Sequence, residues 1–256
     1  MRYYFLSDLH MGRGWTNGHK CKADDFTARK EDLFIRLLQR VIDEEAQLYI
    51  VGDLFENYAC STHEIITGNL NLLRAMTKIV TGWVRGNHDP ADLDKGWKHA
   101  LKMRGSGMIW ADNARIWVEH GHAFDASWQR GFAVKWGARA LYWTERLFPG
   151  IDEGLARVLH RWQDRARKKA NEQDERLPYW WGAWQRRQSR KPAGLSVPDA
   201  VVFGHSHHMG IEDMSGWLYV NTGTWARDDQ GREREDVTVY DGQTRTWWQG
   251  QAGEIV

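Results

Sequence analysis

Aspartate, asparagine and histidine side chains recur along this chain in five short groups, each just after an apolar run. The groups are Asp8-Leu9-His10, Gly52-Asp53-Leu54-Phe55-Glu56, Gly86-Asn87-His88-Asp89, His120-Gly121-His122 and Gly204-His205-Ser206-His207. They offer carboxylate, amide and imidazole ligands but no thiolate, a set that suits hard or borderline divalent cations. Two such cations about 3.5–4 Å apart can activate water and clamp an in-line displacement at phosphorus. The residue types therefore predict a two-metal hydrolase that acts on phosphate esters.

The apolar runs before these groups have the length and composition of buried strands. They are residues 3–6, 48–51, 79–84, 116–118 and 201–203. Because ligands of open α/β sheets bind at the carboxyl ends of strands, we expect the five groups to converge on one crevice. Asp53 follows Gly52, which lets the backbone approach closely, and its carboxylate is the expected bridge between two cations.

Each group alone has a simpler interpretation. An isolated Asp-x-His is commonly a surface turn, and clustered histidines can be incidental. The run from Gly86 to Asp89 could be a turn, because Gly and Asn tolerate positive φ and Asn and Asp close Asx turns. The joint occurrence of five groups, each behind an apolar run, favours one shared metal site over five separate turns.

In this order the groups resemble the motifs D-x-H, G-D-x-x-(D/E), G-N-H-(D/E), H-x-H and G-H-x-H of the calcineurin-like metallophosphoesterase superfamily. The resemblance spans residues 1–125 and again 199–224. It implies an α/β (α+β) fold, a two-sheet β-sandwich flanked by helices on both outer faces. Carried over motif by motif, it implies one metal ion held by Asp8, His10, Asp53 and His207, and another held by Asp53, Asn87, His120 and His205.

The resemblance also implies that His88 lies beside the phosphate, as a general acid or as a donor to the transition-state charge. We expect Glu56, Asp89 and His122 to support the ligands rather than to bind metal. For Glu56 two interpretations stand, a hydrogen bond to a ligand histidine and pairing with a nearby arginine. Manganese is the expected metal, with iron, zinc and nickel as alternatives.

Among subfamilies, the Ser7-Asp8-Leu9-His10 opening and the Gly-Asp-Leu-Phe-Glu form of the second motif are similar to the UDP-2,3-diacylglucosamine pyrophosphatase-like branch of lipid A biosynthesis. Typical members of that group carry Arg where this chain has His88. The implied reaction is hydrolysis of a phosphodiester or pyrophosphate bond, in UDP-2,3-diacylglucosamine or a related nucleotide-linked lipid. The alternatives are a small-molecule or cyclic-nucleotide phosphodiesterase, a nuclease, a phosphomonoesterase and a non-catalytic scaffold.

Length and composition agree with this interpretation. The 256 residues suffice for one large α/β domain, and the net charge of +1 gives no overall attraction to nucleic acid or membrane. Cys21 and Cys60 match neither a disulfide framework nor a zinc spacing, so we expect a cytoplasmic protein. Apolar periodicity predicts helices over residues 26–42 and from the Ser61/Glu64 capping box to Met76. Residues 237–240 and 244–248 predict a β-hairpin around Asp241-Gly242.

Residues 126–198 differ in kind from the predicted core of residues 1–125 and 199–256. They hold seven of the sixteen tryptophans, and residues 125–191 carry fifteen basic and eight acidic residues, a net of +7. Since the whole chain totals +1, the rest carries −6 and the charge is segregated. We expect this region to be a helical insert, with helices near residues 132–147 and 152–166, that caps the metal crevice.

Within the insert, Arg161, Arg165 and Lys168 recur at helical spacing opposite an apolar stripe. We expect them to bind a phosphorylated small-molecule or lipid substrate, or to contact the inner membrane peripherally. The simpler interpretation is a satellite subdomain with a tryptophan core and solvated charges. Single-stranded nucleic acid would suit the same composition. A nuclease, however, is expected to spread basic charge around the cleft rather than to confine it to one insert.

Overall fold

The computed structural model describes residues 1–12, 15–16, 19–20, 28–57, 61–91, 93–124, 177–190, 196–226 and 232–256. Its helices are α1 (Ala28–Asp43), α2 (Thr62–Gly68), α3 (Leu70–Ile79), α4 (Lys95–Ala100), the 3₁₀ helix η1 (His122–Phe124), α8 (Leu177–Arg190) and α9 (Ala252–Ile255). The predicted cap helices and the residues Arg161, Arg165 and Lys168 lie outside the described residues.

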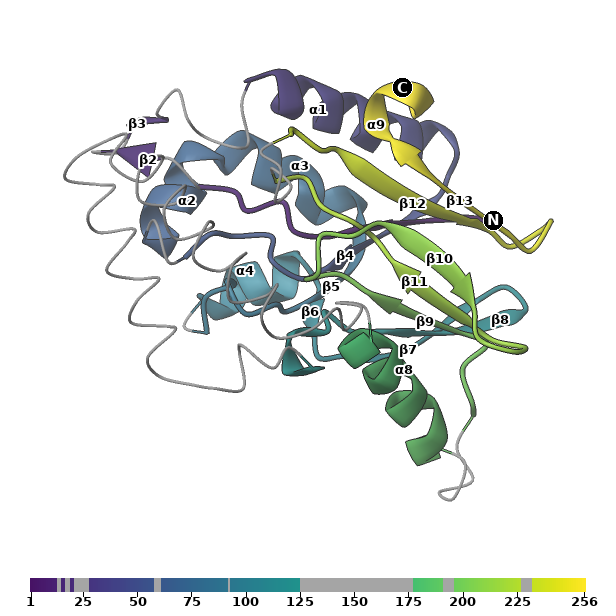
Figure 1. The fold of residues 1–256 in the computed structure, drawn as a ribbon. Helices are drawn as coiled ribbons and strands as arrows, with labels where there is room; N and C mark the ends of the chain where they lie inside the picture. Colours follow the sequence, from purple (N-terminus) through teal and green to yellow (C-terminus); the bar gives the residue numbers. More distant parts are fainter. Residues whose placement is uncertain are drawn as a thin grey trace.

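Two mixed sheets make up the centre of the fold (Figure 1). The first has the order β13-β12-β1-β4-β5-β6 and contains β1 (Arg2–Leu6), β4 (Gln47–Val51), β5 (Val80–Val84), β6 (Met103–Arg104), β12 (Asp236–Asp241) and β13 (Thr246–Gln251). The second has the order β10-β11-β9-β8-β7 and contains β7 (Gly107–Ala111), β8 (Ala114–Val118), β9 (Ala200–Phe203), β10 (Gly210–Asp213) and β11 (Leu218–Asn221). A two-stranded sheet pairs β2 (Trp15–Thr16) with β3 (His19–Lys20).

Successive side chains of each strand point to opposite faces of its sheet, so the buried apolar residues form three separate cores. Tyr3 and Phe5 of β1 pack between the two sheets, against residues such as Val202 of β9. Tyr4 and Leu6 point to the other face, where α1 and α3 cover the first sheet. On the outer face of the second sheet, α8 packs against Val201, Phe203 and Tyr219. Figure 1 shows α1 and α8 on opposite sides of the paired sheets, so the predicted sandwich with helices on both outer faces is confirmed.

Parallel pairing brings the carboxyl ends of the predicted strands together. β1 pairs in parallel with β4, and β4 with β5, in the first sheet. β8 pairs in parallel with β9 in the second. Each of these five strands is followed directly by one of the five polar groups. The strand predictions are therefore confirmed, apart from Ile79, which is the last residue of α3.

Three local predictions need correction. The Ser61/Glu64 capping box is present, but the helix expected to reach Met76 is two helices. α2 ends at Gly68, a poor helix former, and the Asn69 side chain donates to the Ile65 carbonyl oxygen at 2.9 Å.

The other two corrections concern the ends of elements. The C-terminal hairpin is present, but its second strand begins at Thr246, so its loop is longer than the predicted Asp241-Gly242 turn. The apolar periodicity that predicts the helix over residues 26–42 ends with Ile42, which is 50% exposed near the end of α1, whereas Val41 is buried. In the described ranges, no helix is long and apolar enough to cross a membrane.

Candidate metal centre

The backbone turns sharply at the predicted ligands. Asp8, His10, Asp53, His205 and His207 have φ angles of 53°, 47°, 50°, 68° and 59°. The left-handed region is uncommon for residues other than glycine, although Asp and His enter it more readily than most. Unfavourable backbone conformations persist where the surrounding structure imposes them, and they cluster at functional sites. Five of the predicted metal ligands therefore share a backbone feature that the sequence patterns did not reveal.

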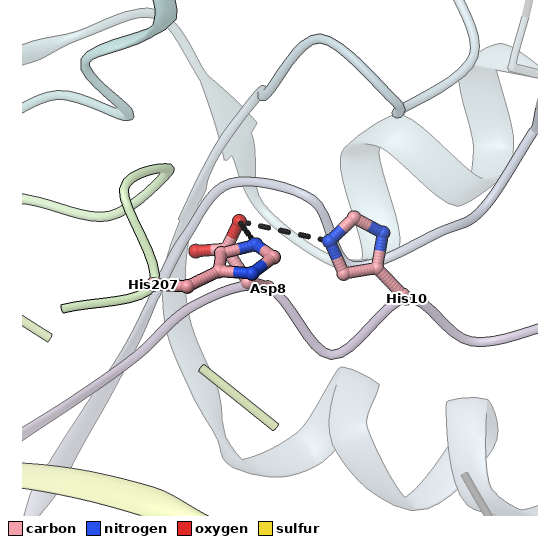
Figure 2. A group of neighbouring side chains, drawn as sticks. All are labelled: Asp8, His10 and His207. Atoms are coloured by element: carbon pink, nitrogen blue, oxygen red, sulfur yellow. Dashed lines mark hydrogen bonds and ion pairs between the residues drawn. The ribbon is translucent and has the colours of Figure 1, made fainter. Parts of the chain in front are cut away.

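One group of ligand-capable side chains combines Asp8, His10 and His207 (Figure 2). One ligand atom from each lies within 4.8 Å of the others. Oδ1 of the buried Asp8 carboxylate is 3.2 Å from Nε2 of His207 and 3.7 Å from Nε2 of His10. The other Asp8 oxygen accepts a hydrogen bond from the backbone N–H of His205 at 3.0 Å. The loops after β1 and β9 are thus joined at Asp8.

The His10 ring fits a metal ligand. Its Nδ1 lies 2.9 Å from Glu56 Oε2, and because a carboxylate accepts, Nδ1 keeps its proton and Nε2 is the nitrogen that would bind a metal ion. Nε2 is buried and makes no hydrogen bond within the described part of the chain. Buried polar atoms are normally hydrogen-bonded, so a nitrogen facing Asp8 at 3.7 Å suits a cation between the two.

A second group combines Asp53, His120 and His205, again with ligand atoms within 4.8 Å of one another. His120 Nδ1 donates to the Val51 carbonyl oxygen at 2.8 Å, which leaves Nε2 as the ligand atom. That Nε2 lies 3.0 Å from Asp53 Oδ2 and 3.1 Å from Asn87 Oδ1. The residues expected to hold the second metal ion are therefore close together.

Two motif glycines leave the room that these side chains occupy. A Cβ on Gly52, whose φ is +90°, would lie 2.2 Å from His120 Nδ1. A Cβ on Gly86 would lie 2.1 Å from Asp53 Oδ1. Both distances are far below van der Waals contact, so any larger residue would displace a predicted ligand.

Buried acids and imidazoles shift one another's protonation in the metal-free protein. Burial alone would raise the pKa of Asp8, but the His120 and His207 imidazoles hold it well below its usual range. Burial would also raise the pKa of Asp53, but the His120 and His88 imidazoles lower it below its usual range. Burial lowers the pKa of His120, yet Asp53 and Asp8 raise it to about 9. Protons on the imidazoles thus balance the buried carboxylates, and divalent cations would take over that role.

Glu56 joins His10 to His88. The carboxylate is fully buried, and its two oxygens lie 2.9 and 2.8 Å from His88 Nδ1. The His88 ring meets the His10 ring edge-on, with 4.7 Å between centroids. Of the two interpretations of Glu56, the structure shows the contact with histidine, and with two histidines rather than one.

Asp89 ties the loop after β4 to the loop after β5. Its carboxylate accepts hydrogen bonds from the backbone N–H groups of Asp53, Phe55 and Gly86 at 3.0, 2.9 and 2.7 Å. Burial and the neighbouring Asp53 charge raise the pKa of Asp89 to about 7. His122 lies behind the second group, 5.5 Å from the His120 ring and 6.2 Å from the His205 ring, and burial lowers its pKa to about 4.

The comparison with known families agrees with this geometry. A profile described as calcineurin-like phosphoesterase matches residues 1–209. The chain belongs to the calcineurin-like phosphoesterase family. A comparison with curated proteins gives no match.

Solved structures resemble the chain at low identity. An archaeal phosphodiesterase has a TM-score of 0.49 and 11% identity over 98% of this chain and 99% of its own. The phosphoesterase Yfce from E. coli has a TM-score of 0.45 and 14% identity over 98% of this chain and 100% of its own. Vacuolar protein sorting 29 from Cryptosporidium parvum has a TM-score of 0.43 and 16% identity over 97% of this chain and 95% of its own. At these values the likenesses carry no argument about activity.

Membership of the calcineurin-like phosphoesterase family, together with the ligand-capable groups, identifies the chain as a metal-dependent phosphoester hydrolase that uses divalent ions. Sequence reasoning missed several supporting contacts of this centre. Fully buried Lys30 of α1 donates to the Trp225 carbonyl oxygen at 2.6 Å, and the Trp225 N–H donates to the Asp8 carbonyl oxygen at 3.1 Å. No spacing pattern marks such a contact, because it joins residues far apart in the sequence.

Proposed function

We propose that this calcineurin-like phosphoesterase hydrolyses a phosphodiester or pyrophosphate bond at a pair of divalent ions, with Mn²⁺ as the expected metal. The observation that carries the proposal is the presence of two ligand-capable groups, Asp8–His10–His207 and Asp53–His120–His205, with His88 beside the first. Oxygen and imidazole ligands suit Mn²⁺, while iron, zinc and nickel are the alternatives.

Each ligand has an assigned place in this proposal. Asp8, His10, Asp53 and His207 would hold one ion, and Asp53, Asn87, His120 and His205 the other. Asp53 is the proposed bridge, which is supported by its buried carboxylate: Oδ2 lies 3.0 Å from His120 Nε2, and Oδ1 accepts a hydrogen bond from the His88 backbone N–H at 2.8 Å. Bound ions would polarise the phosphoryl oxygens and activate the attacking water.

His88 acts on the phosphate rather than on a metal ion. Its Nδ1 is held by Glu56, so Nε2 is the nitrogen that would meet a phosphate oxygen or the leaving oxygen. From there it donates a proton to the leaving group or stabilises the negative charge of the transition state. Glu56 keeps the His88 and His10 rings in a fixed relation, which couples the proton donor to a metal ligand.

The proposed substrate is UDP-2,3-diacylglucosamine or a related nucleotide-linked lipid. The Gly-Asp-Leu-Phe-Glu motif and the tryptophan-rich basic insert support it. In this proposal Arg161, Arg165 and Lys168 bind the anionic substrate, and the insert contacts the inner membrane from the cytoplasm. A small-molecule or cyclic-nucleotide phosphodiesterase is the second candidate, since the metal centre itself would serve either substrate.

Three substrates distinguish the activities. Protein loaded with Mn²⁺ is assayed on UDP-2,3-diacylglucosamine, bis(4-nitrophenyl) phosphate and 4-nitrophenyl phosphate. We expect both diester-type substrates to be cleaved and the monoester to have a kcat/KM lower by about tenfold or more, a difference of about 1.4 kcal/mol in transition-state binding. Preferential cleavage of the monoester would replace the proposal with a phosphomonoesterase.

A charge-reversal variant at Arg161, Arg165 and Lys168 tests the substrate itself. Cleavage of the lipid nucleotide should fall by about tenfold or more, while bis(4-nitrophenyl) phosphate, which reaches the metal centre unaided, should react at the wild-type rate. Equal loss on both substrates would mean that these residues support the fold. No loss on either would remove them from substrate binding.

A further inference from the structure

Helix α8 forms an ion pair with Glu119, the residue that precedes the predicted metal ligand His120. Arg186 donates from Nε and Nη2 to the two carboxylate oxygens of Glu119, at 2.6 and 2.7 Å. Its guanidinium also lies 5.0 Å from the centre of the Phe124 ring. Glu119 is largely buried, accepts a further hydrogen bond from Trp117 Nε1 and stands directly before His120. A two-pronged arginine–carboxylate pair fixes geometry as well as charge.

The same helix reaches the other histidine of the second group. Gly182 lies so close to η1 that a Cβ there would meet the Phe124 ring at 2.3 Å. Phe124 stacks on Phe203, the last residue of β9, with ring centroids 5.5 Å apart. One turn before Gly182, the largely buried Tyr179 places its ring 6.1 Å from the His205 ring. These contacts of α8 join the ends of β8 and β9, where His120 and His205 stand.

We propose that α8 positions the His120–His205 half of the metal centre, with Arg186 acting through Glu119 on His120 and Tyr179 packing beside His205. The role rests on the proposed function, because it assumes that these histidines hold a metal ion. A ligand must be kept within about 0.5 Å of its productive position, and its supporting partners supply that constraint. Since α8 lies in the stretch assigned to the insert, this described part of the insert would support the metal centre.

Arg186→Met tests this role through metal binding rather than through activity. Metal-free protein is titrated with Mn²⁺, and the free ion is followed by its electron paramagnetic resonance signal. Wild type is expected to bind two ions. The variant should lose about tenfold or more in affinity for one ion, the lower range for removal of an outer partner of a metal ligand, and keep its affinity for the other.

Glu119→Gln removes the other partner of the same ion pair. It should weaken the same ion, and the double variant should lose little more than either single variant, because both act through one contact. Additive losses would mean that Arg186 and Glu119 act separately, and would overturn the proposed route to His120.

Arg115→Met is the matched control. Arg115 forms a comparable two-pronged pair with Asp199, at 3.0 and 2.6 Å, at the opposite ends of β8 and β9. Exposed pairs of this kind contribute about 0–1 kcal/mol, so the control should keep both affinities. If Arg186→Met does not fold, as judged by its thermal melt, Arg186→Lys takes its place and should show a smaller loss at the same single ion.

Two results would overturn the role of α8 alone: wild-type affinity for both ions in Arg186→Met, or an equal weakening of both. Binding of fewer than two Mn²⁺ ions by the wild-type protein would instead contradict the metal centre itself. The wild-type titration and the variant titration therefore separate failure of the proposed function from failure of this inference.

Discussion

Each of two predicted ligand histidines is held through one ring nitrogen so that the other faces an acid. Glu56 holds Nδ1 of His10, and the Val51 carbonyl oxygen holds Nδ1 of His120. In both rings Nε2 then points at an aspartate oxygen. Such partners set the tautomer and ring orientation in advance, so a metal ion would meet ligands that need little rearrangement.

His88→Ala tests the residue assigned to the phosphate. The variant should keep both metal ions and lose roughly 10²- to 10⁴-fold in kcat, the range for a general acid or charge stabiliser. Metal content and kcat are measured on aryl diesters with good and poor leaving groups. A loss that shrinks with good leaving groups indicates proton donation, and an equal loss on all of them indicates charge stabilisation.

His99→Ala is the control for this experiment, since His99 lies exposed on α4. Its kcat should equal that of wild type. An unchanged kcat in His88→Ala would exclude His88 from the reaction, and a lost metal ion would make it a ligand.

The sequence predicted which side chains would lie at the metal centre, but not the contacts that support them. Ligand-type residues after apolar runs indicated which side chains would meet. The sharing of Glu56 between His10 and His88 depends on side-chain rotamers and on the approach of two loops. Neither is encoded in the spacing of one motif, so the sequence left two interpretations of Glu56 open.

At the scale of elements, the loops that follow neighbouring strands are tied to each other by backbone contacts. The N–H groups of Asp8, His10 and Met11 donate to carbonyl oxygens of the second motif, residues 52–54. Asp89 closes the other side, because its carboxylate holds three backbone N–H groups of the second and third motifs. The predicted ligands are thus positioned by loop-to-loop hydrogen bonds rather than by a single rigid element.

Asp89→Asn should destabilise the protein. An amide offers one acceptor oxygen, so its NH₂ group would face a backbone N–H, and a buried N–H left without an acceptor costs about 1–3 kcal/mol. The free energy of unfolding of metal-free protein, measured in urea, checks this. Asp94→Asn is the matched control: Asp94 caps α4 through the Gly96 N–H, and asparagine is an equally good cap. Equal stabilities of the two variants would contradict the role of Asp89.

The sequence predicted the strands that precede the polar groups, but not β2, β3, β6, β7, β10 and β11. The five strands before the polar groups are largely apolar runs, and their observed ends lie within two residues of the predicted ends. The helix after Ser61 divides at Gly68-Asn69, where the side-chain cap of Asn69 ends α2. α8 was missed as a separate element because its tryptophans and arginines follow no single apolar stripe.

For the whole molecule, the balance of buried charge predicts how pH acts on the metal-free protein. The pKa of His120 is raised from 6.5 to about 9, so its stabilising contribution is complete below 6.5 and is lost as pH rises through about 9. Asp8, Asp53 and Glu56 have lowered pKa values, so their contributions are already complete above pH 5 and stay constant in this window. Asp89, whose pKa is raised to about 7, loses its stabilising contribution as pH rises through about 7 and so adds to the fall.

Thermal melts between pH 6.5 and 9 check this prediction. The melting temperature of the metal-free protein should fall across the window, and that of the Mn²⁺-loaded protein should fall less, because a ligated imidazole is neutral throughout. A metal-free protein whose melting temperature rises over the same range would show that the imidazoles are not charged by the buried acids.

We propose that strand-end groups from both sheets together hold the two metal ions of a phosphodiester hydrolase. Metal-free protein titrated with Mn²⁺, with bound metal and bis(4-nitrophenyl) phosphate hydrolysis followed in the same samples, tests it most directly. We expect no hydrolysis above the uncatalysed rate without metal, and full activity only when two ions are bound per chain. Full activity in the metal-free protein, or at a single bound ion, would contradict it.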